Sequence, residues 1–309
     1  MAFPVAADEK SHSGTMIPTI WEKKFLKFFY LSTALAAISN TDYEGEIKAH
    51  GDKVEVNYLQ GGESHEYVKG KKLVYTELES ATRTLLIDRG RSFQFPADYI
   101  DKSQAMKSLD YVNKWSEHLA QITKRDIEHI VLSEIFSEVD AANAGANAGA
   151  DTADYNLGSA GAPKALVKTD IIDDIVNWGD VLDQQNIPDD GRWLVLPTWA
   201  AALIKKSELR DASITGDNQS VLRNGRIGMI DRFEIFSSRN LLQVTDSSGK
   251  KAWNAMAGHK SAITFATQLT ATERMKNPDT FGELIRSLQS FGFAVMQPSA
   301  LEHLYISRS

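Results

Sequence analysis

The chemistry open to this chain is limited first by its composition, because none of its 309 residues is a cysteine. Disulfides, thiolate nucleophiles, cysteine-bound zinc and iron–sulfur clusters are therefore excluded. The seven histidines form neither an H-E-x-x-H motif nor another metal-ligand spacing. His118 and His129 lie on one expected helix about three turns apart, too far to share a metal, so we expect both to be solvated.

Carboxylates and glycine-rich loops offer no clearer site. Five aspartates lie close together in the sequence: Asp170, Asp173, Asp174, Asp180 and Asp183. Helical spacing spreads them over several turns and no EF-hand loop fits, so we expect a solvated acidic face or a subunit contact. The segment Gly158–Gly161 lacks the G-x-S-x-G spacing of a nucleophile elbow, and no phosphate-binding loop is present. We therefore predict no catalytic residue, no metal and no cofactor, and a protein that is not an enzyme.

Charge and hydropathy exclude further classes of function. Hydrophobic residues make up 42% and charged residues 24% of the chain, as in typical globular proteins. The formal charge of -7 argues against tight binding of nucleic acid, whose affinity comes mainly from neutralised phosphates. No run of 18 apolar residues exists, so no membrane-spanning helix is expected.

Two helices are expected in the first half of the chain, after an irregular arm. The first is amphipathic and runs from about Trp21 to Ile38, although Lys23–Ala37 imitates a signal peptide. The second is very long, Asp101–Val139, or roughly 55 Å. It carries two apolar stripes that are offset by one position. The alternative is two helices that are broken near Lys124.

Extended segments lie between these two helices. Residues 52–58 alternate between apolar and polar types, which predicts a half-buried strand. Gly61 and Gly62 predict a loop tip, after which a second extended run follows near Glu66–Tyr75. The charged segment 58–72 cannot build a core, so it should project and become ordered against a neighbouring molecule. Two further short strands are expected at 84–87 and 92–95.

The second half of the chain predicts an α/β arrangement. Residues 141–150 are all alanine, asparagine or glycine. Such small and polar side chains offer little surface to bury, so a linker or mobile loop is expected there. Helices are expected at Lys168–Asp183 and Trp199–Lys206. Strands are expected at Arg192–Pro197, Arg232–Ser237, Ser261–Thr267 and Gly282–Val295.

Charge is distributed unevenly along this half. Residues 161–200 contain 3 Lys+Arg and 7 Asp, whereas residues 201–260 contain 10 Lys+Arg and 6 acids. The basic set includes Lys205, Lys206, Arg210, Arg223, Arg226, Arg232 and Arg239. Opposed patches on one molecule favour self-association, although such asymmetry also arises by chance.

Several strings in the sequence are similar to those of one family, over a span from about residue 17 to the end. They are Ser39–Lys48, Gly51–Val54, Val181–Pro188, Gly191–Trp193, Leu209–Ser213, Val221–Gly228 and Ala257–Ala266. On these strings the chain resembles the major capsid (coat) proteins of tailed bacteriophages.

The resemblance implies an α+β fold, the phage major-capsid fold. That fold has an N-terminal arm, an extended two-stranded loop, a peripheral domain with a long spine helix, and an axial α/β domain. The implied division is 1–40 for the arm, 41–100 for the extended loop and peripheral strands, 101–140 for the spine helix, 141–160 for a linker, 161–257 for the axial domain, and 258–309 for a return to the peripheral domain.

The resemblance also implies a function: a structural subunit that self-assembles into the icosahedral shell around the packaged double-stranded DNA of a tailed phage. The implied partners are copies of the chain in hexamers and pentamers, and separate scaffold, portal and decoration proteins. DNA would be a weakly contacted cargo, no membrane would be involved, and the virion capsid would assemble in the host bacterial cytoplasm. The residues expected at subunit contacts are Trp21, Phe25, Gly61, Gly62, Lys69, Lys71, Lys72, Arg210, Arg223 and Arg226.

Two alternatives are kept open at this point. The same fold could form the shell of a bacterial nanocompartment that holds an enzyme cargo. From another class, the chain could be a soluble α/β enzyme. No lysine–asparagine cross-link is predicted, because nothing identifies an asparagine partner for the lysines near the loop.

Overall fold

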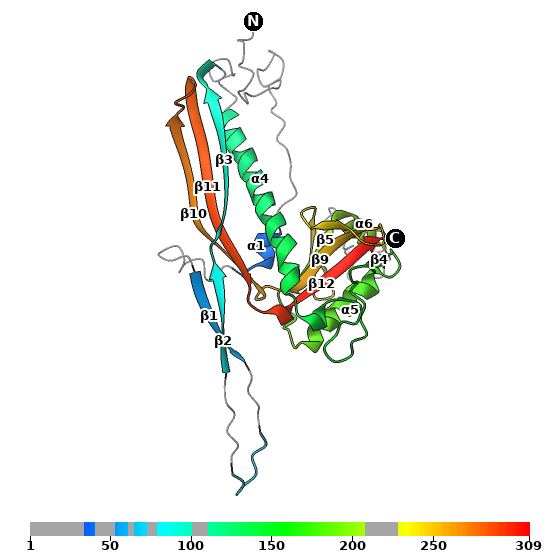
Figure 1. The fold of residues 1–309 in the computed structure, drawn as a ribbon. Coiled ribbons are helices and arrows are strands. Elements are labelled where there is room, and N and C mark those ends of the chain that lie inside the picture. Colours follow the sequence, from blue (N-terminus) through cyan, green and yellow to red (C-terminus); the bar gives the residue numbers. More distant parts are fainter. Residues whose placement is uncertain (1–33, 41–52, 61–64, 73–78, 101–110, 208–227) are drawn as a thin grey trace.

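The computed structural model describes residues 34–40, 53–60, 65–72, 79–100, 111–207 and 228–309. They form a long, narrow body and a rounder body side by side, with a thin hairpin that extends away from both (Figure 1). The narrow body is a three-stranded sheet and the helix α4 (Tyr111–Glu134); the rounder body contains a seven-stranded sheet. Within these ranges, no helix combines the length and the apolar character that crossing a membrane requires.

The narrow body is built on an antiparallel sheet with the order β10-β11-β3. Its strands are β3 (Arg89–Asp98), β10 (Ile263–Lys276) and β11 (Gly282–Val295). The predicted bounds of β11 are confirmed, whereas β3 and β10 extend beyond the short strands predicted there. Since side chains alternate along a strand, Phe95, Ala97 and Ile285 share the face toward α4 and are buried. No described helix covers the opposite face (Figure 1).

The long helix α4 is continuous through Lys124, so the alternative of two helices is wrong. At its end the helix tightens into the 3-10 turn η1 (Ile135–Glu138), so Val139 lies beyond it. The predicted beginning of the helix, at 101–110, lies outside the described residues.

The two offset stripes of α4 pack against different partners. Trp115 and Leu119 contact the small cluster around Phe95 on the three-stranded sheet. Ile127 and Val131, which begin about two turns beyond Leu119, are buried in the main core with residues of the rounder body. The one-position offset in the sequence therefore marks the place where the helix changes its packing partner.

The projecting hairpin pairs β1 (Lys53–Gln60) with β2 (Glu79–Leu86), with Lys53 opposite Leu86 and Gln60 opposite Glu79. Residues 65–72 lie at the tip of this projection (Figure 1). They contain a turn at 69–70 and no paired strand, so the extended run predicted near Glu66–Tyr75 is interrupted there. Without a second layer to cover it, a lone two-stranded ribbon gains little from pairing over its full length.

The rounder body is built on a sheet with the order β4-β12-β9-β5-β7-β6, to which β8 is added on β9. Every residue of β5 is buried, as the apolar run of that strand predicted. The strands are β4 (Lys164–Leu166), β5 (Arg192–Pro197), β6 (Met229–Ile230), β7 (Phe233–Ser238), β8 (Gln243–Thr245), β9 (Lys251–His259) and β12 (Leu301–Arg308).

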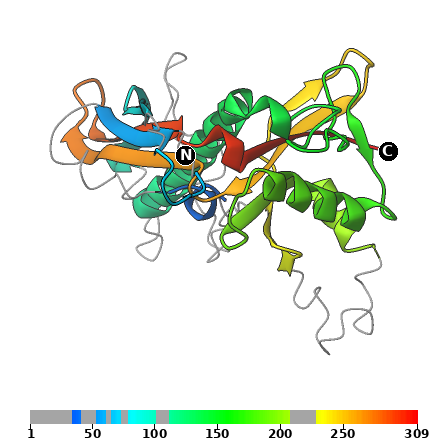
Figure 2. The same cartoon turned by 90° about the horizontal axis from the view of Figure 1, so that it is seen from below.

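Helices complete the core of the rounder body. The helix α5 (Ile171–Gln184) lies along the sheet and buries Trp178 against it (Figure 2). The shorter α6 (Thr198–Ile204) follows β5 directly. Near the junction of the two bodies lie the single-turn α1 (Leu35–Ile38) and two 3-10 turns, η2 (Ala141–Asn143) and η5 (Pro298–Ala300).

Two features correct the predicted division of the chain. The segment 141–160 is packed rather than a free linker: Asn143 is buried and its Nδ2 donates to the carbonyl oxygens of Ser299 and Leu301. Small side chains allow this close approach, and Ala148 is buried as well. The last strand, β12, pairs with β9 in the seven-stranded sheet, so residues 301–308 do not stay with β10 and β11, as the range 258–309 required.

Candidate assembly site

The structure describes three of the residues predicted at subunit contacts. Lys69, Lys71 and Lys72 are exposed at the tip of the projecting hairpin. The remaining seven lie outside the described residues: Trp21, Phe25, Gly61, Gly62, Arg210, Arg223 and Arg226. For all ten, participation in a contact stays a prediction.

The tip of the hairpin also presents two apolar side chains that the sequence analysis missed. The Lys71 N–H donates to the Val68 carbonyl oxygen over 3.0 Å, which closes a turn, and Gly70 within it has a φ of 87° that favours glycine. Tyr67 is 72% exposed and Val68 is 47% exposed. The sequence did contain a signal for this exposed pair, because Tyr67 and Val68 are adjacent apolar residues in an otherwise charged loop. We call residues 67–71 the hairpin turn.

The open face of the three-stranded sheet contains a groove of about 530 Å³. Gln94, Arg286 and Glu273 lie opposite one another on β3, β11 and β10, and therefore share this face. Arg286 Nε donates to Glu273 Oε2 over 2.7 Å, and Leu288 beside them is 40% exposed. We call this groove the sheet groove. Its lining residues are Ser92, Phe93, Gln94, Glu273, Arg286, Ser287 and Leu288.

A second exposed apolar cluster lies at the far end of the narrow body. Phe281, between β10 and β11, is 86% exposed. The Tyr99 N–H donates to the Phe281 carbonyl oxygen over 3.2 Å, and the side chains of Tyr99 and Met275 are also exposed. Exposed apolar side chains that lie close together often mark surfaces that another protein covers, so this cluster is a further candidate for a protein–protein contact.

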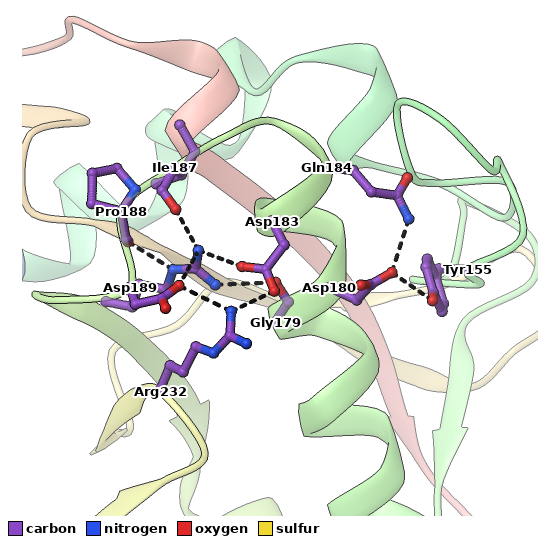
Figure 3. A network of polar contacts seen from close by, with 10 residues as sticks. Tyr155, Gly179, Asp180, Asp183, Gln184, Ile187, Pro188, Asp189 and Arg232 are labelled. Carbon is purple, nitrogen blue, oxygen red and sulfur yellow. Dashed lines mark hydrogen bonds and ion pairs between the residues drawn. The ribbon is translucent and has the colours of Figure 1, made fainter.

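A buried arginine fixes the loop between α5 and β5 (Figure 3). Arg192 donates from Nε to the Pro188 carbonyl oxygen over 2.9 Å and from Nη1 to that of Gly179 over 3.1 Å. Its Nη2 donates to Asp183 Oδ1 over 2.6 Å and also to the Ile187 carbonyl oxygen. The guanidinium is thus surrounded by acceptors from one helix and one loop, which holds residues 187–191 against α5.

Intramolecular partners correct the prediction for three of the five aspartates. Asp183 also pairs with Arg232, whose charge is therefore used within the subunit. Asp180 accepts from the Tyr155 hydroxyl over 2.6 Å (Figure 3). Asp174 is buried and lies 2.5 Å from Lys164 Nζ. These side chains hold the rounder body together and do not form a free acidic face.

Two titratable residues on β12 have unusual surroundings. Glu302 is fully buried, and neither carboxyl oxygen has a hydrogen-bond partner among the described residues. Burial holds the pKa of Glu302 well above its ordinary value, although Arg192 and Lys164 act in the opposite direction. Burial also lowers the pKa of His303 to about 4, and its Nε2 lies 2.8 Å from Asn254 Oδ1. His303 is therefore neutral at pH 7, and burial favours the uncharged form of Glu302.

The two helix histidines differ from each other. His129 is exposed but bonds through Nδ1 to the Asn240 carbonyl oxygen over 2.7 Å, whereas His118 lies edge-on to Trp115 at 5.6 Å between ring centroids. In the ranges that the structure describes, no group of three His, Asp or Glu side chains is placed to hold a metal ion.

Comparison with protein-family models identifies a family for most of the chain. The family described as phage capsid protein matches residues 80–303, which is more than half of the chain. A search of curated proteins found no match.

Solved structures of phage proteins share the fold. A protein of Mycobacterium phage Che8 is 23% identical, with a TM-score of 0.71 over 93% of this chain and 96% of that one. The capsid of the cyanophage P-SCSP1u gives 14% identity and a TM-score of 0.68, with 94% of this chain and 93% of that one covered. The capsid of Ralstonia phage GP4 gives 12% identity and a TM-score of 0.67, with 100% and 99% covered.

Proposed function

Because this chain belongs to the phage capsid protein family, and is therefore a structural subunit of a phage capsid, we propose that it assembles with copies of itself into a closed shell. The observation that carries this proposal is the distance between two exposed surfaces on one subunit. The hairpin turn lies at the tip of a projection that points away from the body that holds the sheet groove (Figure 1). One subunit cannot join the two surfaces, whereas two neighbouring subunits can.

The contact that we propose places the hairpin turn of one subunit in the sheet groove of the next. Tyr67 would supply an aromatic anchor, and Leu288 would supply apolar surface in the groove. An aromatic side chain buries about 150–250 Å². At about 25 cal/mol per Å², this burial would contribute roughly 4–6 kcal/mol before the costs of association.

Charge would help to orient the contact without holding it. The lysines of the hairpin turn and its neighbour, Lys69, Lys71 and Lys72, lie close to solvent, where an ion pair contributes about 0–1 kcal/mol. The Debye length is about 8 Å at physiological salt and shorter in molar salt. We therefore expect molar salt to slow assembly but to leave finished shells intact.

Light scattering during assembly of purified subunits tests the contact. Tyr67→Ala and Leu288→Glu should both assemble more slowly than the parent, with unchanged midpoints of urea unfolding, because both side chains are exposed in the subunit. Tyr67→Phe keeps the ring and is the matched control, which should assemble normally. Parental assembly rates for Tyr67→Ala would refute a role for the hairpin turn.

The finer features of the shell belong to the same proposal. We propose that the subunits form the hexamers and pentamers of an icosahedral shell around double-stranded DNA, with separate scaffold, portal and decoration proteins. The division at 161–257 would place an axial domain around the axes of these rings. The family supports a place in the virion capsid, and we propose assembly in the cytoplasm of the host bacterium.

A non-enzymatic role and a weak interaction with DNA complete the proposal. The family points to structure rather than catalysis, and it does not favour the nanocompartment or the soluble enzyme. At a net charge of -7, the subunit should not hold DNA tightly, which suits a container whose contents must leave. A sub-micromolar dissociation constant for duplex DNA at physiological salt would contradict this part.

A further inference from the structure

We propose that Glu128 is a positioning residue that locks three parts of the subunit into one arrangement. These parts are the N-terminal segment 34–40, the helix α4 and the end of β7 in the seven-stranded sheet. The lock is a property of the single subunit and goes beyond the proposed self-assembly. Only its consequence for the geometry of the shell rests on that proposed function.

The side chain of Glu128 is fully buried, and among the described residues its hydrogen bonds reach two other elements. Its Oε2 accepts a hydrogen bond from the backbone N–H of Ala34 over 2.9 Å, and its Oε1 accepts one from the Ser238 hydroxyl over 2.6 Å. Ala34 directly precedes α1, and Ser238 is the last residue of β7. These partners are 94 and 110 positions away in the sequence, so one carboxylate joins three distant segments.

The next residue on α4 repeats the connection to the seven-stranded sheet. His129 Nδ1 lies 2.7 Å from the Asn240 carbonyl oxygen, which can only accept, so Nδ1 carries the proton. The Asn240 N–H in turn donates to Ser238 Oγ over 3.1 Å. Residues 238–240 are therefore held against α4 at two points rather than one.

The segment 34–40 is also attached at its other end. The Asn40 N–H donates to the Ile263 carbonyl oxygen over 2.8 Å, and the Phe265 N–H donates to the Asn40 carbonyl oxygen over 2.9 Å. Between the two attachments, Leu35 and Ile38 are buried. The segment connects residues 1–33 with residues 41–52, which lead to the projecting hairpin, so its position sets where both begin.

The chemistry of the site requires a hydrogen-bond acceptor at position 128. Both groups that bond to Glu128, a backbone N–H and a hydroxyl, donate to it, and its two carboxyl oxygens accept from both. Leucine is similar in volume but accepts nothing, and because the site is closed to water, both donors would be left without this partner. In glutamine, the amide oxygen can accept from the Ala34 N–H and the amide NH₂ can donate to the Ser238 hydroxyl, which also accepts. Glu128→Leu therefore loosens the lock, and Glu128→Gln is the conservative variant that keeps it.

Hydrogen exchange of the full, unassembled chain tests the lock directly. In Glu128→Leu, the amides of 35–40 and 239–241 should exchange roughly ten- to a hundredfold faster than in the parent, because two buried donors lose their acceptor. Glu134→Leu is the matched control. Glu134 lies on the same helix but is exposed and bonds to Arg89 within the narrow body, so these amides should be unaffected.

A second variant separates a specific loss from a general loosening of the fold. Glu128→Gln keeps an acceptor for the Ala34 N–H and a donor for the Ser238 hydroxyl, so protection of 35–40 should remain close to that of the parent. Unchanged exchange in Glu128→Leu, equal acceleration in Glu134→Leu, or equal acceleration in Glu128→Gln and Glu128→Leu would each overturn the lock.

The consequence for the shell has its own measurement, which is the diameter distribution of assembled particles in electron micrographs. The Glu128→Leu variant should give a broader distribution than the parent, because the two bodies of each subunit are held less firmly. Faster exchange with an unchanged diameter distribution would overturn this consequence but not the lock. Failure of the parent to form particles would instead refute the proposed self-assembly.

Discussion

Replacing Arg192 with leucine should unfold the rounder body at lower urea concentrations, because this side chain is the centre of a buried polar network. The guanidinium is inaccessible to solvent and donates to three backbone carbonyl oxygens and one carboxylate. Leucine fills part of the volume but offers no donor. The carbonyl oxygen of Ile187, which is buried, would lose its bond to the guanidinium, and Asp183 would lose one of its two cations.

The expected loss of unfolding free energy in Arg192→Leu depends on which partners of the arginine keep another interaction. Breaking a buried ion pair by removing one partner costs about 3–5 kcal/mol. Asp183 keeps its contact with Arg232 and is 31% exposed in its side chain, which places the loss at the lower end, about 3 kcal/mol. Arg232→Leu is the matched control: its side chain is 40% exposed and binds the same carboxylate, so it should lose much less.

Urea unfolding of the unassembled subunit, followed by tryptophan fluorescence, measures both variants. Trp178 and Trp193 are fully buried in the rounder body, so the signal reports on the body that contains Arg192. We expect a clear fall in the midpoint for Arg192→Leu and a small one for Arg232→Leu, with the same slope. Equal losses in the two variants would refute the argument from burial.

Further predictions use the same unfolding assay. Glu302→Gln should raise the free energy of unfolding more at pH 7 than at pH 4. The folded protein holds the Glu302 proton more tightly than the unfolded chain does, so the parent loses stability as pH rises above the ordinary pKa of 4.5. Identical pH profiles for the parent and the variant would contradict this. The folded pKa of His303 is lowered to about 4, so stability should fall as pH falls from 6.5 toward 4, and His303→Gln should remove that slope. Gly158→Ala should destabilise the fold by more than Gly145→Ala, which should cost about 1–2 kcal/mol. Both glycines have positive φ, but a Cβ at Gly158 would lie 2.0 Å from the Tyr305 carbonyl oxygen, whereas one at Gly145 would meet nothing within 4 Å. Equal losses in the two variants would show that backbone strain alone decides the cost.

The elements with a strong period were predictable from the sequence. The helix α4 and the strand β11 follow from apolar spacings of three or four and of two, because each buries one continuous stripe. Even the offset between the two stripes of α4 was visible. Its meaning was not, because it depends on which partners the helix meets along its length.

The strand β12 was missed because its residues contradict the usual composition of a buried strand. Glu302 and His303 stand near its beginning, and both are largely withdrawn from water in the centre of the sheet. A sequence gives no means of knowing that burial will raise the pKa of the glutamate or that the histidine will bond to Asn254. These are effects of tertiary burial on pKa, which local patterns do not contain.

The candidate site was only partly predictable for a related reason. The lysines of the projecting loop follow from charge and the lack of a core, and Tyr67 had a weak local signal. The sheet groove had none, because Gln94, Arg286 and Glu273 meet only through the register of three strands that are far apart in the sequence. The partners of Asp174 and Asp183 were hidden in the same way.

A reconstruction by electron cryomicroscopy of particles that contain this chain tests the central claim most directly. We predict a closed shell in which this subunit is the repeating unit, with Tyr67 of each subunit seated in the sheet groove of a neighbour, beside Leu288. A shell built from another protein, with this chain absent from the shell layer, would contradict the account.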